Sequence, residues 1–193
     1  MKLQKAAMFG LDARIALAIF GALSVISGAA LYSAIQESKD ISLITESREF
    51  TKAIESYMLD TGVDLPIDPA DAGDKDLFLF SKELITSSAT GWNGPYLSME
   101  EVSDRYLDSS AGTYYAMRAT DANFGGSTPT QPTKCGSPCF YWIGFRTVSA
   151  QQAASLDLKI NGAKTDYESG NARFFPSSDR YNFWLKGPPA LQQ

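Results

Sequence analysis

The chain has 193 residues, no histidine and a formal net charge of −5, from 17 basic and 22 acidic side chains. This length suits one domain with an appendage. Histidine is the usual acid–base catalyst near neutral pH, and the nucleophile motifs Ser-x-x-Lys and Gly-x-Ser-x-Gly are absent too. The cations are too scattered to form the patch that nucleic acid requires. We therefore expect neither an enzyme nor a nucleic-acid-binding protein.

An uncharged segment near the N-terminus is long enough to cross a membrane. The 21 residues from Ile15 to Ile35 carry no charge, and about 20 apolar helical residues span the hydrocarbon core. Small residues permit close packing of one helix on another, and several occur in this segment: Gly21, Ser24, Ser27, Gly28, Ala29 and Ala30. We expect a transmembrane helix that packs against its own kind.

The helical pattern continues beyond this segment. Apolar residues recur mostly at steps of three and four, at Ile41, Ile44, Phe50, Ile54 and Tyr57. Gly62 is a stop signal, and a helix cannot easily resume at Pro66. The pattern predicts one helix of some fifty residues that ends at about Asp60.

The rest of the chain predicts an antiparallel sheet with short helices. Apolar spacing indicates helices over 77–85 and 150–160. Runs rich in aromatic residues predict strands over 114–118, 140–147, 172–175 and 181–185. The C-terminal aromatics are expected in a core packed on the long helix: Phe174, Phe175, Tyr181, Phe183 and Trp184. The order of elements predicts an α+β fold.

The two cysteines lie close together, at Cys135 and Cys139. They are too few for a zinc site and do not have the CxxC spacing of a redox motif. A short disulfide loop fits better, and it would imply an oxidising compartment. Two free thiols in a reducing compartment are the alternative.

Two local motifs carry a family resemblance. The segment that closes the long helix reads Tyr57-Met58-Leu59-Asp60, and a later stretch reads Gly91-Trp92-Asn93-Gly94-Pro95-Tyr96-Leu97. Together with a short basic leader, a membrane-length helix and a sheet, they resemble the type IV pilins and the pseudopilins of type II secretion. The resemblance implies a pilin-like fold and a structural role in a filament.

The resemblance also implies processing by a prepilin peptidase, and two cleavage sites are open. Cleavage between Ala7 and Met8 makes Asp12 the fifth mature residue, where the family carries a buried acid. Cleavage between Gly10 and Leu11 retains the usual small residue but places no acid fifth. We favour the first, because the spacing from Asp12 to the helix-ending tyrosine then matches the family. A carboxylate in an apolar helix needs a partner, either the amine of a neighbouring subunit, as in the family, or Arg14 of a neighbour.

These features divide the chain into a leader over 1–7 (alternatively 1–10), an assembly half of the helix over 8–36 and a globular domain over 37–193. The implied partners are copies of the chain, the prepilin peptidase, an inner-membrane assembly platform and membrane lipid. The implied location is a single pass of the inner membrane, with the globular domain periplasmic or, in a filament, extracellular.

The sequence departs from the major pseudopilins over 98–110, an acidic stretch that replaces their Asp-Pro-Trp-Gly-Asn-Pro segment. Their calcium site therefore has no matching positions here. Asp157, Asn161 and Asp166 are weak candidates for calcium, and a plain solvated turn is the favoured interpretation. No other cofactor is expected.

An ordinary signal peptide is the runner-up interpretation. Lys2 and Lys5 give a positive start, and Gly28-Ala29-Ala30 could serve as its cleavage site. The chain would then be a secreted or tethered binding module of the cell envelope. Helical periodicity runs through position 30 without a break, which favours the pilin-like interpretation.

Overall fold

The computed structural model describes residues 3–69, 78–122, 124–125, 135, 138–162, 167–177 and 180–191, with side chains from Gly10 onward. The chain divides into two compact units, Met1–Lys39 (unit 1) and Asp40–Gln193 (unit 2). Helix α1 (Leu3–Thr61) runs through both. Gly62 follows it with a φ of 72°, and its N–H donates to the Met58 carbonyl at 2.9 Å. The predicted long helix and its glycine stop are therefore confirmed.

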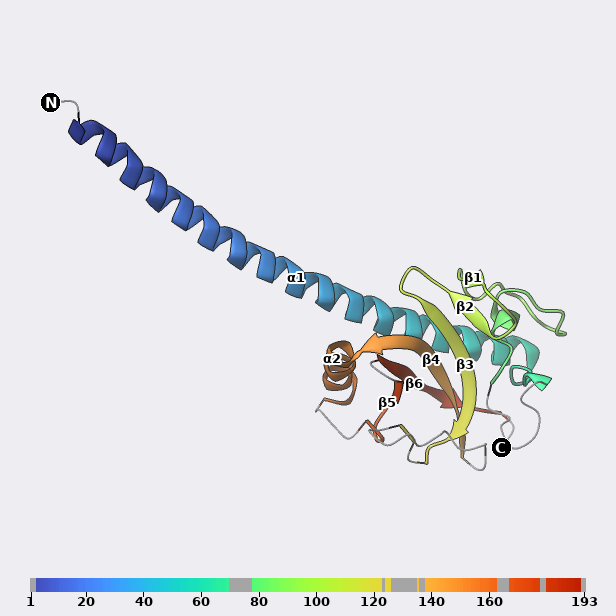
Figure 1. The fold of residues 1–193 in the computed structure, drawn as a ribbon. Coiled ribbons are helices and arrows are strands. Elements are labelled where there is room, and N and C mark those ends of the chain that lie inside the picture. Colours follow the sequence, from blue (N-terminus) through green and yellow to red (C-terminus); the bar gives the residue numbers. More distant parts are fainter. Residues whose placement is uncertain are drawn as a thin grey trace. The chain divides into compact units, whose positions relative to one another are not determined.

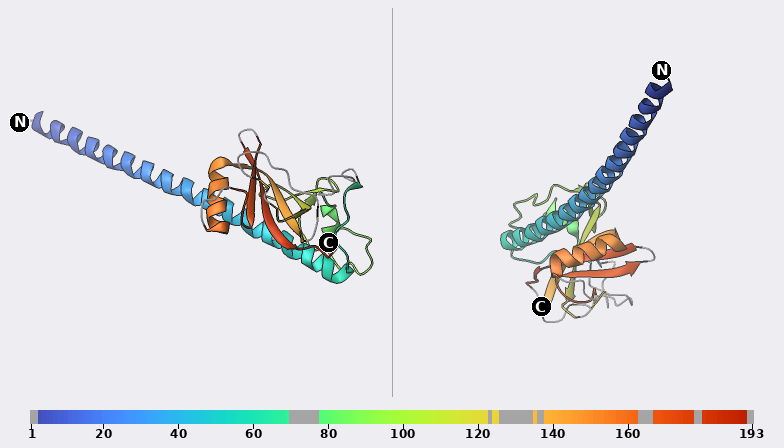
Figure 2. Two further views of the ribbon diagram at one scale, coloured as in Figure 1. Left: turned by 90° about the horizontal axis from the view of Figure 1, so that it is seen from below. Right: turned by 90° about the vertical axis from the view of Figure 1, so that its left-hand side faces the viewer.

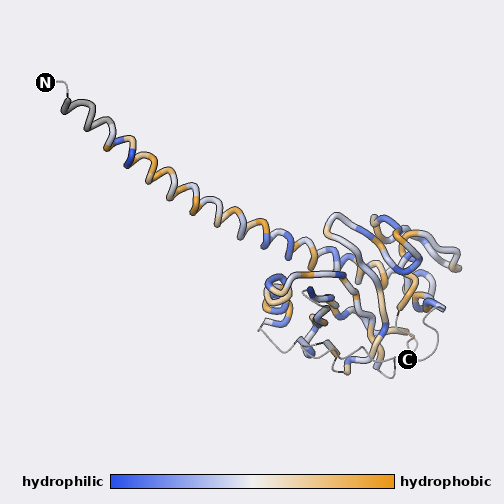
Figure 3. The backbone as a smooth tube through the Cα atoms, viewed as in Figure 1, coloured by the Kyte–Doolittle hydropathy of each residue, from blue (hydrophilic) through white to orange (hydrophobic). Residues whose placement is uncertain are grey.

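Unit 1 is helical and exposes its side chains all round. Every described side chain from Gly10 to Lys39 is exposed except the half-buried Gln36. Hydrophobic residues recur along this part of the tube in Figure 3. By length and composition, this is the one helix in the described part of the chain that could cross a membrane.

From Asp40 onward α1 has one buried face. Its core residues are Leu43, Phe50, Ile54 and Tyr57, together with Ser47 and Ala53. Ile41 was expected on this stripe, but its side chain is 52% exposed. The buried residues Leu43, Ser47, Phe50, Ile54 and Tyr57 are four and three apart, which follows one helix face, and Ile41 falls outside it.

Unit 2 contains a six-stranded antiparallel sheet in the order β1-β2-β3-β4-β6-β5. The strands are β1 (Glu100–Glu101), β2 (Tyr106–Asp108), β3 (Thr113–Thr120), β4 (Cys139–Ser149), β5 (Ala172–Ser177) and β6 (Arg180–Pro189). The four predicted strands correspond to β3 to β6, so the α+β prediction is confirmed. Strands β1 and β2 were missed, because they are very short and acidic residues disfavour strands.

The predicted helix over 150–160 is α2 (Ala150–Asn161), capped by Ser149, whose side chain accepts from the Gln152 N–H. The helix predicted over 77–85 is wrong. Leu77 lies outside the described residues, Phe78 and Leu79 form isolated bridges with Met117 and Ile67, and a 3₁₀ turn, η2 (Ser81–Leu84), follows. Pairing with distant residues overrides the local helical spacing here.

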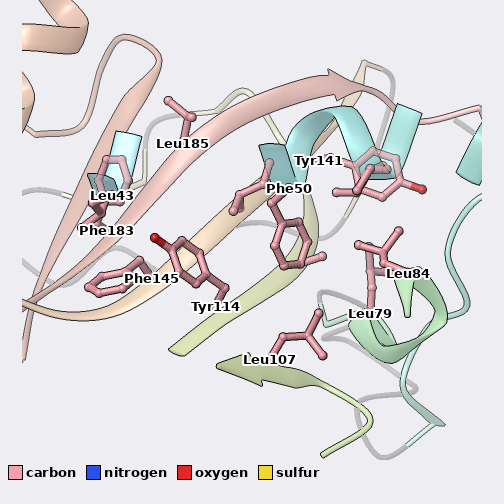
Figure 4. Close-up of a cluster of buried hydrophobic side chains, with 14 of the residues drawn as sticks. Leu43, Phe50, Leu79, Leu84, Leu107, Tyr114, Tyr141, Phe145, Phe183 and Leu185 are labelled. Carbon is pink, nitrogen blue, oxygen red and sulfur yellow. The ribbon is translucent and has the colours of Figure 1, made fainter. Parts of the chain in front are cut away.

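The two faces of the sheet carry separate clusters. The face toward α1 and α2 holds the main core, part of which Figure 4 shows. The opposite face holds Tyr115, Met117, Ala119, Phe124, Trp142 and Trp184. Successive strand residues point to opposite faces, so Phe174 and Phe183 join the main core while Phe175 and Trp184 pack on the other face. The expectation that all the C-terminal aromatics pack toward the helix is thus wrong for these two.

A buried polar cluster lies just after the end of α1. Asp64 accepts from the Tyr141 hydroxyl at 2.8 Å and from the Leu191 N–H at 3.0 Å, and it lies 3.5 Å from the Arg118 guanidinium. The Tyr141 hydroxyl also accepts from the Leu65 N–H at 3.1 Å. Burial, followed by the neighbouring Asp64 charge, raises the pKa of Tyr141. The cluster joins the end of the helix, the centre of the sheet and the C-terminal segment. The backbone course of these three parts can be followed in Figure 2.

Replacing Tyr141 with phenylalanine should destabilise unit 2 by about 1–3 kcal/mol, because Asp64 and the Leu65 N–H each lose a buried partner. Urea unfolding of the full chain in detergent, followed by tryptophan fluorescence, measures this loss. Tyr181→Phe is the matched control, since no hydrogen bond of its hydroxyl is found within the described part, and it should cost less than about 0.5 kcal/mol. Equal effects of the two substitutions would contradict the role given to Tyr141.

Candidate assembly site

The exposed apolar surface of unit 1 is the strongest functional feature. Leu17, Phe20 and Val25 are each at least 70% exposed. Leaving one such side chain in water rather than burying it costs about 1.5–3 kcal/mol. A surface of this kind and size marks a site that contacts lipid or protein.

Asp12 and Arg14 lie on α1 and are both exposed. Residues two apart on a helix lie roughly 200° apart around its axis, so the two cannot form a pair on one face. Neither is in an ion pair with any residue that the structure describes. Both are therefore available to a neighbouring molecule.

The two candidate processing sites lie in the same helix. Gly10 and Leu11 are exposed. Ala7 and Met8 are helical, and their side chains lie outside the described part.

The two motifs of the family resemblance meet at the end of α1, in what we call the helix-end clasp (Tyr57, Asp60, Gly91, Trp92 and Tyr96). The Tyr96 hydroxyl donates to the Asp60 carboxylate at 2.7 Å. The Trp92 indole N–H donates to the Glu83 carbonyl at 2.9 Å. The Tyr96 ring makes edge contacts with Tyr57 and Trp92, at centroid distances of 6.4 and 5.8 Å. The clasp therefore fixes a loop against the last turn of the helix.

The clasp leaves no room for a side chain at Gly91. A Cβ atom there would lie 2.3 Å from the Asp60 carbonyl oxygen, and the residue has a φ of 88°. Gly94, which precedes Pro95 through a cis peptide bond, lies against the Trp92 ring. Desolvation raises the pKa of Tyr96, and its hydrogen bond to Asp60 adds to the shift. These contacts give the motif residues a structural role.

Cys135 and Cys139 form a disulfide, with their Cα atoms 5.2 Å apart. The predicted pairing is thus confirmed. Cys139 begins β4, and its carbonyl accepts from the Ala190 N–H at 2.9 Å. The bridge therefore holds the chain where it enters the central part of the sheet.

Two of the three calcium candidates, Asp157 and Asn161, form hydrogen bonds within the protein. Asn161 donates to the Asp157 carboxylate at 2.7 Å and to the Ala172 carbonyl at 3.1 Å, and its amide oxygen accepts from the N–H groups of Asn171 and Ala172. Asp157 is fully buried. Asp166 lies outside the described residues. Within the described ranges, no three Asp, Glu, Cys or His side chains are grouped to hold a metal.

Asn161 has a role that the sequence did not reveal. Strand β5 is one edge of the sheet, and Asn161 occupies both backbone groups of Ala172 on the open side of that edge. The Phe174 N–H donates to the Tyr167 carbonyl, and Pro176 has no N–H to offer. The other edge, β1, consists of two glutamates. Both edges are thus protected against strand pairing, which leaves the helix as the better surface for self-association.

These features define a class: an α+β protein of pilin-like arrangement, with one membrane-length N-terminal helix. Comparison with known proteins adds no closer relationship, since no family model, no curated protein and no solved structure matches the chain.

Substituting alanine for Gly91 should destabilise unit 2 by about 3 kcal/mol or more, because a clash with the helix backbone adds to the cost of a positive φ. Gly62→Ala is the matched control. It has a similar φ of 72° but open space around its Cβ position, so it should cost only about 1–2 kcal/mol. Urea unfolding measures both. Equal losses of stability from Gly91→Ala and Gly62→Ala would show that the clasp does not hold the end of the helix.

Proposed function

We propose that the chain is a structural subunit of a type IV pilus-like filament, most specifically a type II secretion pseudopilin, and not an enzyme. The observation that carries this proposal is the fully exposed apolar helix of unit 1 on a pilin-like fold. The motif residues Tyr57, Asp60, Trp92 and Tyr96 support it, since the two motifs meet at the helix end. The protected sheet edges support it as well, because they favour assembly through the helix.

In this proposal the helix has two successive environments. Lipid covers residues 15–35 while the subunit waits in the inner membrane, and neighbouring helices cover them in the filament. A neighbouring helix can approach closely at Gly21 and Gly28 because glycine has no side chain, and no atom of the described chain lies within 4 Å of a Cβ position at either residue. Unit 2 lies in the periplasm or outside the cell, where the Cys135–Cys139 disulfide persists. The implied partners are a prepilin peptidase and an inner-membrane assembly platform.

The mature N-terminus and the assembled form test this proposal together. Protein purified from envelopes of cells that overproduce the chain should begin at Met8 (or Leu11), carry a methylated N-terminal amine, as the resemblance implies, and form filaments visible by electron microscopy. The fragment 37–193, which lacks the span, should be monomeric under the same conditions. A mature chain that begins at Leu31 would indicate a signal peptide, and one that begins at Met1 a simple anchor, and either would contradict the proposal.

Asp12 should act in assembly through its charge. An amide cannot balance a cationic partner inside an apolar bundle, so Asp12→Asn should lower the filament yield about tenfold or more. Asp12→Glu retains the charge and should remain within about threefold of the unaltered chain. Filament mass sedimented from cells with matched expression measures both. Normal filaments from Asp12→Asn would show that the carboxylate only marks the membrane boundary.

A further inference from the structure

The C-terminal segment, residues 188–191, has few means of attachment to the rest of unit 2. It continues from β6 at the end of the sheet where β3 ends and β4 begins (Figure 1). Pro188 and Pro189 have no N–H, so Ala190 and Leu191 supply the only backbone donors of this segment. Pro189 and Leu191 are exposed, and the buried side chain of Ala190 is a single methyl group. Hydrogen bonds, more than apolar burial, therefore hold the C-terminal segment.

The two donors connect the disulfide to the end of α1. The Ala190 N–H donates to the Cys139 carbonyl at 2.9 Å. The Leu191 N–H donates at 3.0 Å to Asp64, in the buried polar cluster just after α1. The same carboxylate accepts from the Tyr141 hydroxyl. Release of Ala190 from Cys139 would therefore weaken the contact that Leu191 makes at the helix end.

Cys139 lies at the end of a strand, where pairing is weakest. It is opposite Thr120, the last residue of β3. The pairing of β4 with β6 is irregular here as well, because the register shifts between Phe140 and Trp142. Strand ends open locally before the centre of a sheet does. The bridge to Cys135, which packs against the main core, therefore restrains a position that would otherwise fray.

The bridge can be reduced from one side. Cys135 is half-buried and Pro138 is exposed, whereas Cys139 is fully buried. A thiolate of a dithiol reagent can attack the Cys135 sulfur, which breaks the S–S bond, and the Cys139 thiolate leaves and takes up a proton. The second thiol of the reagent then closes the reagent's own disulfide and leaves Cys135 as a thiol. Two electrons thus pass from the dithiol to the protein.

We propose that the Cys135–Cys139 disulfide is a redox-sensitive lock on the C-terminal segment, and that its reduction releases residues 188–191 from the end of α1. In the chain-entropy treatment, a bridge that closes so short a loop raises the ratio of closed to open chain about 30-fold. The segment therefore closes on the helix end in an oxidising compartment and opens where the cysteines remain thiols. This inference is independent of the proposed function, because every contact in it lies within unit 2.

Hydrogen exchange at single amides tests the lock. The full-length chain in detergent micelles is compared by ¹H–¹⁵N NMR before and after reduction with dithiothreitol, and alkylation establishes the state of both cysteines. Exchange at Ala190 and Leu191 should become about tenfold faster or more on reduction. Exchange at Leu65, whose N–H donates to the Tyr141 hydroxyl, should rise by a smaller factor. The Gly162 amide, at the C-terminal end of α2, is the control and should stay within about twofold.

Cys135→Ala reaches the unbridged state without a reagent. This variant should reproduce the faster exchange at Ala190 and Leu191 to within about threefold and should not respond to dithiothreitol. Unchanged exchange in the variant or on reduction would overturn the proposal, and so would free thiols in the chain purified from the envelope. A rise at Gly162 equal to that at Ala190 would overturn it too, because the bridge would then stabilise the whole of unit 2 and not one segment.

Discussion

The helix α1 meets two environments along its length, and the change occurs at Asp40. Before this residue every described side chain except the half-buried Gln36 is exposed, and from Asp40 onward one face of the helix is buried in unit 2. Asp40 itself is 3% exposed and accepts from Ser155 and Lys159 of α2, at 2.6 and 2.9 Å. A buried carboxylate needs such partners. This ion pair lies where the folded unit begins.

Hydrogen bonds hold the end of α1, as they hold its entry into unit 2 at Asp40. The clasp fixes the last turn through Asp60 and Tyr96, and the polar cluster around Asp64 fixes the chain immediately after the helix. Segments from the middle of the sequence and from the C-terminal strand converge there. Anchoring at both ends lets residues 40–61 act as a rigid element of the unit 2 core.

Local signals in the sequence were sufficient for most of the architecture. The apolar segment over 15–35, the stop at Gly62 and the aromatic runs of β3 to β6 predicted the correct elements, because periodicity and glycine conformation act within a few residues. The disulfide followed from cysteine spacing in the same way. The prediction that Asp12 acts in assembly rested on the resemblance alone, and the structure shows only that its side chain is exposed.

Only the tertiary structure decided which distant residues meet. Phe78 and Leu79 form isolated bridges with Met117 and Ile67 in place of a local helix, and Asn161 closes a sheet edge instead of offering oxygens to a metal. The sequence alone determined that a membrane-length helix precedes an α+β unit, since hydrophobicity and period are local properties. The contacts that join the helix end to the Trp92 loop bring together residues far apart in the sequence, which no local pattern encodes.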